Sequence, residues 1–133
     1  TVLSKGDDQQ DPIADADRGV LDGHIVLSRR LAEEGHYPAI DIEASISRVM
    51  PQVITPQHLR ESQRFKQLRP RYQQTRDLIS VGAYVPGGDP QTDLAIALQP
   101  KMVKYLCQGL DESENLAQSS LQLSALFNPP AGA

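Results

Sequence analysis

The spacing of apolar residues changes at Pro51, and this change constrains what the chain can fold into. Before Pro51, apolar residues stand in short β-type runs, whereas after it they recur at three- and four-residue steps, the period of a helix with one buried face. The sequence predicts an α/β part at residues 1–51, an all-α helical bundle at 52–127 and a disordered tail at 128–133. The buried face of the first long helix is expected to hold Leu59, Ser62, Phe65, Leu68, Tyr72, Thr75 and Ile79.

Short helices are expected between the β-type runs of the α/β part. The runs are residues 2–3, 24–27 and 37–40. Asp11 and Pro12 form the N-cap and first-turn signature of a helix over residues 12–20. A second helix is expected over 28–34, where Gly35 supplies a left-handed stop. Strand, helix and strand at this spacing indicate a βαβ unit, so we expect the edge of a parallel sheet.

Prolines divide the helical part. Thr55 begins the first long helix as its N-cap, and Pro70 is expected to kink or interrupt that helix near Arg69. Asp89 and the proline after it begin the next helix, which Pro100 is expected to restart. A last helix is expected at about residues 113–127.

The composition excludes several classes of site. A single cysteine, Cys107, allows neither an internal disulfide nor a multi-cysteine zinc site. His24, His36 and His58 do not have metal-ligand spacing. No Gly-x-x-x-x-Gly-Lys-Ser/Thr motif occurs, so the phosphate-binding loop of self-contained P-loop enzymes is absent. Without a signal peptide or a long apolar run, a cytoplasmic location is expected.

Charge is unevenly distributed along the chain. The net charge is −4, yet residues 51–90 are net basic. This basic set has two interpretations: a surface for nucleic acid or an acidic partner, or the solvated face of a helix, which we favour. Its members are Arg60, Arg64, Lys66, Arg69, Arg71 and Arg76.

Two polar segments of the α/β part are candidates for chemistry. Arg48 follows a strand-type run in a position suited to present a guanidinium to an anion, but from its spacing we favour an ordinary ion pair with Asp41 or Glu43. The acidic cluster at residues 7–11 either coordinates a cation or caps a helix. We expect Asp11 to be the cap and residues 7–10 to contact a partner.

Four segments together resemble one family. They are GDDQQDPIAD at residues 6–15, LDGHIVLSR at 21–29, HYPAIDIEASISR at 36–48 and RDLISVGAY at 76–84. They resemble the C-terminal third of flagellar protein-export (type III secretion) ATPases, which are related to the α and β subunits of F-type ATP synthase. The last segment resembles the flagellar branch more than the injectisome branch.

This resemblance implies the C-terminal edge of a RecA-like parallel sheet in a homohexameric ATPase that uses ATP and Mg²⁺. Arg48 matches the arginine finger that reaches the γ-phosphate in the adjacent subunit, and Tyr37 and Tyr105 match aromatic residues of the adenine pocket. The loop matched to a contact with the central stalk consists of Asp7, Asp8, Gln9, Gln10 and Asp11. The residues that hold the phosphates and Mg²⁺ in this family have no match here, so we expect a fragment that is inactive alone.

The resemblance also implies where such a protein works and with what. The location is cytoplasmic, at the inner face of the membrane at the flagellar base. Expected partners are further copies of the chain, a central-stalk-like export protein, export chaperones and substrates, and the export gate, with no nucleic acid. Two alternatives remain open: a module without catalysis of its own, whose helical part docks a stalk protein, chaperone or export gate through its basic face, and an injectisome-type ATPase. A regulatory subunit of a rotary ATP synthase is less favoured.

Overall fold

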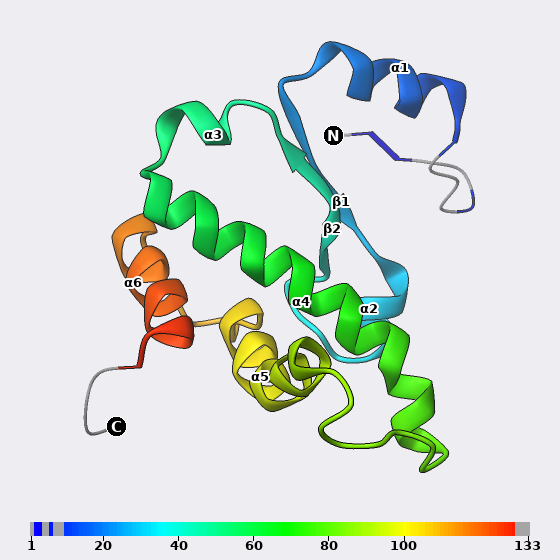
Figure 1. Cartoon of the computed structure of the whole chain (residues 1–133). Coiled ribbons are helices and arrows are strands. Elements are labelled where there is room, and N and C mark those ends of the chain that lie inside the picture. Colours follow the sequence, from blue (N-terminus) through cyan, green and yellow to red (C-terminus); the bar gives the residue numbers. More distant parts are fainter. Residues whose placement is uncertain (1, 4–5, 7–9, 130–133) are drawn as a thin grey trace. The chain divides into compact units, whose positions relative to one another are not determined.

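The computed structural model describes residues 2–3, 6 and 10–129. The chain divides into two compact units, Thr1–Val53 and Ile54–Ala133, and each is described by itself (Figure 1). The predictions for Asp7, Asp8, Gln9 and residues 130–133 lie outside the described part.

The first unit contains short helices and one pair of strands. Asp11 begins the first helix as expected, because its Oδ1 accepts hydrogen bonds from the backbone N–H groups of Ile13 (2.9 Å) and Ala14 (3.4 Å). Ser28 caps the second helix, and Gly35 beyond its end has a φ of 75°, as predicted. In chain order the elements are α1 (Pro12–Val20), β1 (Gly23–Leu27), α2 (Arg29–Glu33), β2 (Ile40–Ser47) and α3 (Met50–Val53).

The prediction of an α/β part followed by helices is confirmed, but the two strands pair antiparallel (Figure 1). Gly23 faces Ser47 at one end of the pair and Leu27 faces Ile40 at the other. A parallel pair needs a connection that returns the chain to the starting end of the first strand, usually through a long helix. Here α2 has only five residues, and the chain simply reverses. The expected parallel pairing is therefore wrong for these strands, and residues 2–3, expected as the first strand of the βαβ unit, do not form a strand.

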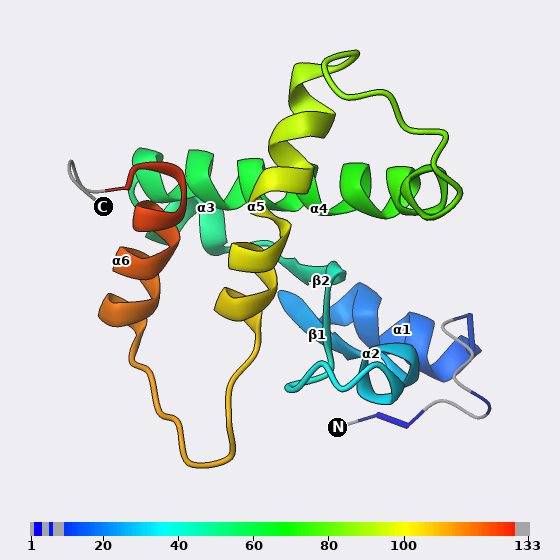
Figure 2. The same cartoon turned by 90° about the horizontal axis from the view of Figure 1, so that it is seen from below.

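The second unit consists of α4 (Pro56–Ser80), α5 (Pro90–Leu106) and α6 (Leu116–Phe127). Figure 2 shows α5 and α6 beside each other, both packed on α4, and all three pairs are in contact. The last helix begins later than expected because Asn115 and Gln118 form a capping box there.

Both helices with an internal proline continue through it, so the predicted break near Arg69 and the restart at Pro100 are wrong. Leu68 and Arg69, directly before Pro70, are buried. Met102, two residues after Pro100, is fully buried. Packing on the neighbouring helices offsets the free-energy cost of the backbone hydrogen bond that each proline cannot donate.

The apolar core lies in the helical unit. On the predicted buried face of α4, the apolar residues Phe65 and Leu68 are buried, whereas Ile79 is exposed. In the described part of residues 1–53 the buried apolar residues are Ala14 and Leu31. The buried apolar residues of the helical unit are Phe65, Leu68, Ala95, Met102, Leu123 and Leu126.

Among the described residues, no helix combines the length and the apolar character needed to cross a bilayer.

Candidate functional site

Arg48 lies directly after β2 and is held at both its backbone and its side chain. Its backbone N–H donates to the carbonyl of Asp22 at 2.8 Å, and its Nη2 donates to the carbonyl of Arg18 at 3.3 Å. The side chain is exposed. Within the described part of the chain, it forms no ion pair with Asp41 or Glu43, so the ion pair that the spacing favoured is wrong.

The carboxylate of Asp41 is used locally instead. Its Oδ1 accepts from the N–H groups of Glu43 (3.0 Å) and Ala44 (3.1 Å), which closes a turn inside β2. The Ser45 hydroxyl donates to the Asp41 carbonyl (2.6 Å) and accepts from the N–H of Val26 (3.0 Å). These bonds span the register shift of the strand pair, so Asp41 shapes the strand that leads to Arg48.

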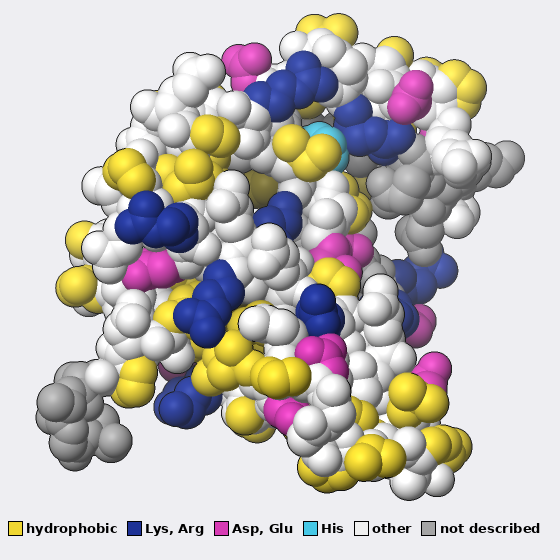
Figure 3. All heavy atoms as spheres, viewed as in Figure 1, with side chains coloured by type: hydrophobic (Ala, Val, Ile, Leu, Met, Phe, Trp, Pro, Cys, Tyr) yellow, Lys and Arg dark blue, Asp and Glu magenta, His cyan; other side chains and the backbone are white. Residues whose placement is uncertain are grey.

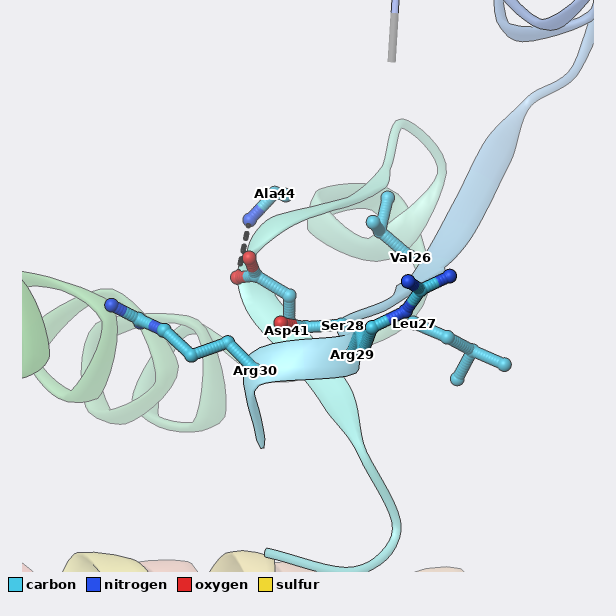
Figure 4. A pocket seen from close by; sticks show the side chains of 7 residues that line it. All are labelled: Val26, Leu27, Ser28, Arg29, Arg30, Asp41 and Ala44. Carbon is cyan, nitrogen blue, oxygen red and sulfur yellow. Dashed lines mark hydrogen bonds between the residues drawn. The ribbon is translucent and has the colours of Figure 1, made fainter. Parts of the chain in front are cut away.

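The β1–β2 pair and the start of α2 border an open hollow of about 300 Å³. Figure 4 shows the side chains of Arg29 and Arg30 pointing in different directions, and Arg30 pairs with Glu34 at 4.0 Å. The two guanidinium groups do not converge on one point, so the hollow does not form a focused anion site. Its lining consists of Val26, Leu27, Ser28, Arg29, Arg30, Asp41 and Ala44.

Tyr37 stands in the segment between α2 and β2 with 57% of its surface exposed. It precedes β2, whereas Arg48 follows it, so the eight residues of the strand separate the two side chains. The structure therefore places them at opposite ends of one element and does not bring them together.

Tyr105 belongs to the other unit, where it links three helices. Its ring lies 5.6 Å from that of Phe65 on α4, measured between centroids, and its hydroxyl donates to the carbonyl of Ser119 on α6 at 3.2 Å. Burial raises the pKa of the Tyr105 phenol above its ordinary value of 10.0. These contacts give it a packing role; its role at a nucleotide stays a prediction.

In the acidic cluster, the part that the structure describes is Gln10 and Asp11. Asp11 caps α1, as predicted, while the partner contact expected for the cluster stays a prediction. No group of three or more His, Cys, Asp and Glu residues in the described ranges is arranged to hold a metal ion.

The basic set on α4 does not form one continuous patch. Arg69 is buried, Arg64 lies over the ring of Phe127 at 5.0 Å, and Arg71 pairs with Asp89 at 2.8 Å. Figure 3 shows Lys and Arg side chains separated from one another by other groups on this face. These three arginines are thus held separately in the helical unit and do not form one basic surface.

Gly23, which sequence reasoning missed, lies against the two residues that precede Arg48. A Cβ at this position would lie 2.7 Å from the carbonyl oxygen of Ile46 and 3.2 Å from the Cα of Ser47. Only a residue without a side chain fits beside these two backbone groups. A glycine at the start of a β-type run was the available signal, but its partner strand could not be read from the sequence.

Two families match the chain, one in each unit. Residues 54–125 match the T3SS EscN ATPase C-terminal domain. Residues 1–47 match the nucleotide-binding domain of the ATP synthase alpha/beta family.

Curated relatives and solved structures agree with these matches. The chain is 78% identical to a flagellum-specific ATP synthase of Pseudomonas aeruginosa and 58% identical to that of Salmonella typhimurium, over 96% of this chain in both cases. It spans only 28% of the length of each of these relatives.

Among solved structures, it is similar to the assembled ATPase EscN of the enteropathogenic E. coli type III secretion system, with a TM-score of 0.91 and 41% identity over 94% of this chain and 30% of EscN. It is also similar to EscN in complex with its central stalk EscO, with a TM-score of 0.82 and 41% identity over 86% of this chain and 28% of that one.

Proposed function

The chain belongs to the family of type III secretion ATPases, and from this we propose that it is the C-terminal part of a hexameric ATPase that energises flagellar protein export. The observation that carries the proposal is the match of residues 54–125 to the EscN C-terminal domain, beside 78% identity to a flagellum-specific relative. That identity favours the flagellar over the injectisome branch. Residues 1–51 then belong to the nucleotide-binding core and residues 52–127 to the helical C-terminal domain.

Arg48 is proposed to act in trans, on the ATP held by a neighbouring subunit. Its guanidinium is exposed and, within the described part, is bound to a neutral carbonyl and to no carboxylate. A phosphate oxygen forms stronger, charge-assisted bonds with a guanidinium than a carbonyl does. The side chain is thus free to exchange the Arg18 carbonyl for a γ-phosphate, and it stays charged at any relevant pH.

Tyr37 is proposed to stack on the adenine of the subunit's own ATP. Its exposed ring offers the flat apolar surface that a base requires. Its position before β2, with Arg48 after it, fits a segment that serves two different nucleotides. For Tyr105, the second aromatic residue that the resemblance implies, the known contacts are all inside the helical unit.

The residues present fit only part of an ATP–Mg²⁺ complex. A guanidinium suits a phosphate and an exposed aromatic ring suits a base, but no described cluster suits Mg²⁺. The 133 residues contain no phosphate-binding loop. We therefore assign the phosphates and Mg²⁺ to other segments of the whole protein, and expect these residues alone not to hydrolyse ATP.

Replacing Arg48 in the full-length protein tests the catalytic proposal. Arg48→Ala should lower kcat by about 10³- to 10⁵-fold, the usual effect of losing an arginine finger, with the hexamer preserved. Tyr37→Ala is the contrasting variant: it should raise the KM for ATP and reduce the preference for ATP over GTP. Near-normal hydrolysis by Arg48→Ala hexamers would rule out the finger.

A second candidate function is docking of a partner, and a specific surface favours it. Leu78, Val81 and Val85 are 49%, 76% and 72% exposed at the end of α4 and in the loop that follows. Figure 3 shows hydrophobic side chains gathered at this end of the helix. We call these three residues the apolar tip. Exposed apolar clusters mark interaction sites, and EscN was solved with its central stalk EscO, so a stalk-like protein is the proposed partner.

A further inference from the structure

The backbone of Arg48 is tied to the segment that joins α1 to β1. Its N–H donates to the carbonyl of Asp22 at 2.8 Å, one residue beyond the last strand pair, Gly23 with Ser47. This bond continues the hydrogen-bonded hairpin past the end of β2. It prevents the residue after the strand from turning away freely, so the Cα of Arg48 has a defined place.

The guanidinium of Arg48 is tied to the same segment. Arg18, whose carbonyl accepts from Nη2 at 3.3 Å, lies in the last turn of α1. Carbonyl groups in a last helical turn lack partners within the helix and carry the negative end of its dipole. They attract a cation, and the bond is weak enough to yield to an anionic phosphate.

Gly23 completes the arrangement by leaving room for the end of β2. The space its side chain would need is taken by the backbone of Ile46 and Ser47, the two residues before Arg48. A Cβ at 2.7 Å from a carbonyl oxygen is not tolerated, so any larger residue must push the end of β2 away. Gly19, four positions earlier, offers a contrast, because a Cβ added there would meet no neighbouring group within 4 Å.

We propose that Gly23, together with the carbonyl groups of Arg18 and Asp22, is the positioning element of Arg48, and we call these three residues the Arg48 support. The inference rests on the proposed function of Arg48 as a finger. A catalytic group displaced by about 1 Å can cost roughly 10²-fold in rate. Because the finger acts in the transition state, the loss belongs in kcat and not in the KM for ATP.

The test compares four variants of the full-length protein: Gly23→Ala, Gly19→Ala, Arg48→Ala and the double variant with Gly23→Ala and Arg48→Ala. Steady-state kinetics give kcat and KM. For the two slow variants that lack Arg48, single-turnover experiments measure the rate of ATP cleavage. We expect Gly23→Ala to lower kcat by about tenfold to a hundredfold with KM unchanged, and Gly19→Ala to behave as the parent. Light scattering verifies the hexamer in each case.

The double variant separates positioning from a general structural role. If Gly23 acts through Arg48, Gly23→Ala costs nothing further once Arg48 is gone. Equal losses in both backgrounds, an unchanged kcat for Gly23→Ala, or loss of the hexamer in that variant would overturn the inference while leaving the finger intact. Normal hydrolysis by Arg48→Ala would instead overturn the proposed function, and this inference with it.

Discussion

Asp89 shows how one side chain organises the start of a helix. Its carboxylate accepts from the N–H of Gln91 (3.1 Å), the hydroxyl of Thr92 (2.6 Å) and the guanidinium of Arg71 (2.8 Å). The hydroxyl of Thr92 is the largest cause that holds the pKa of Asp89 below its ordinary value of 3.8, and Arg71 contributes less. Asp89 therefore caps α5 and joins it to α4.

The order of these contributions is testable. Thr92→Val, which keeps the shape and removes the hydroxyl, should raise the pKa of Asp89 more than Arg71→Ala does. An NMR titration of the carboxyl carbon measures both, and Arg76→Ala is the control with no contact to Asp89. Equal shifts, or a larger one for Arg71→Ala, would contradict the assignment.

The depressed pKa of Asp89 also sets the direction of a pH effect. In the folded chain the carboxylate is favoured, so its contribution to stability is present above the pKa of the unfolded chain. It is lost as pH falls through the lower pKa of the folded chain. The link between α4 and α5 should thus weaken only in acid, below about pH 4.

At the scale of elements, α4 contains a proline whose free-energy cost is offset by packing. A proline inside a helix lacks a donor and crowds the preceding turn, which costs roughly 3 kcal/mol in an isolated helix. Yet α4 runs for 25 residues through Pro70. Its burial against α5 and α6 keeps it whole, through Phe65 and Leu68 above all.

Replacing this proline should stabilise the helix. Pro70→Ala restores a backbone donor and removes the ring, so the free energy of unfolding is expected to rise by about 1–3 kcal/mol. Chemical denaturation followed by circular dichroism measures it, with the exposed Gln67→Ala as the matched control on α4. A loss of stability would mean that the helices pack well only with the geometry that the proline imposes.

A second link between elements is polar. The Oε1 of Glu61 on α4, which is 9% exposed, accepts from Gln57 (3.0 Å) and from the hydroxyl of Ser124 on α6 (2.9 Å). Asn128, beyond the end of α6, also donates to it at 3.5 Å. A buried carboxylate satisfied by several donors specifies how two helices meet better than an apolar contact does, because it tolerates few alternative registers.

At the scale of the whole molecule, the two units bury apolar residues unequally. The helical unit contains six of the eight buried apolar residues of the described chain, while the strand pair leaves Ile25 and Leu27 more than two-thirds exposed. The larger apolar core of the described chain therefore lies in the helical unit, which also contains the apolar tip.

This difference leads to a prediction about what the isolated chain binds. Residues 1–133, mixed with a stalk-like protein and with labelled ATP, should bind the protein and show negligible binding of the nucleotide. Charges at the apolar tip, as in Val81→Asp with Val85→Asp, should abolish the protein complex, because a buried unpaired charge is costly. Calorimetry measures both interactions.

Gln108→Ala, at an exposed position of the same unit, is the matched control for this experiment. Binding of ATP by the isolated chain would contradict the assignment of the phosphates to other segments. A protein complex that survives the charged tip would place the partner elsewhere on the helical unit.

The sequence by itself determined where four of the helices begin, although α6 starts later than expected. Asp11, Ser28, Thr55 and Asp89 all accept hydrogen bonds from the first turn of the helix that follows them, as three of the four were expected to do. Capping depends on a side chain and on the backbone two or three residues further along, so it can be predicted from the local sequence. The family resemblance could likewise be recognised from the sequence, because its motifs are contiguous segments.

Only the tertiary structure decided how these elements meet. The strands pair antiparallel, α4 passes through Pro70, and Arg48 contacts carbonyl groups of Arg18 and Asp22 instead of the nearby acids. Each of these outcomes depends on groups far apart along the chain, whose encounter is set by packing and by the direction of chain reversal. Local spacing carries no record of such contacts, and for that reason the need for a glycine at position 23 became visible only once β2 lay beside it.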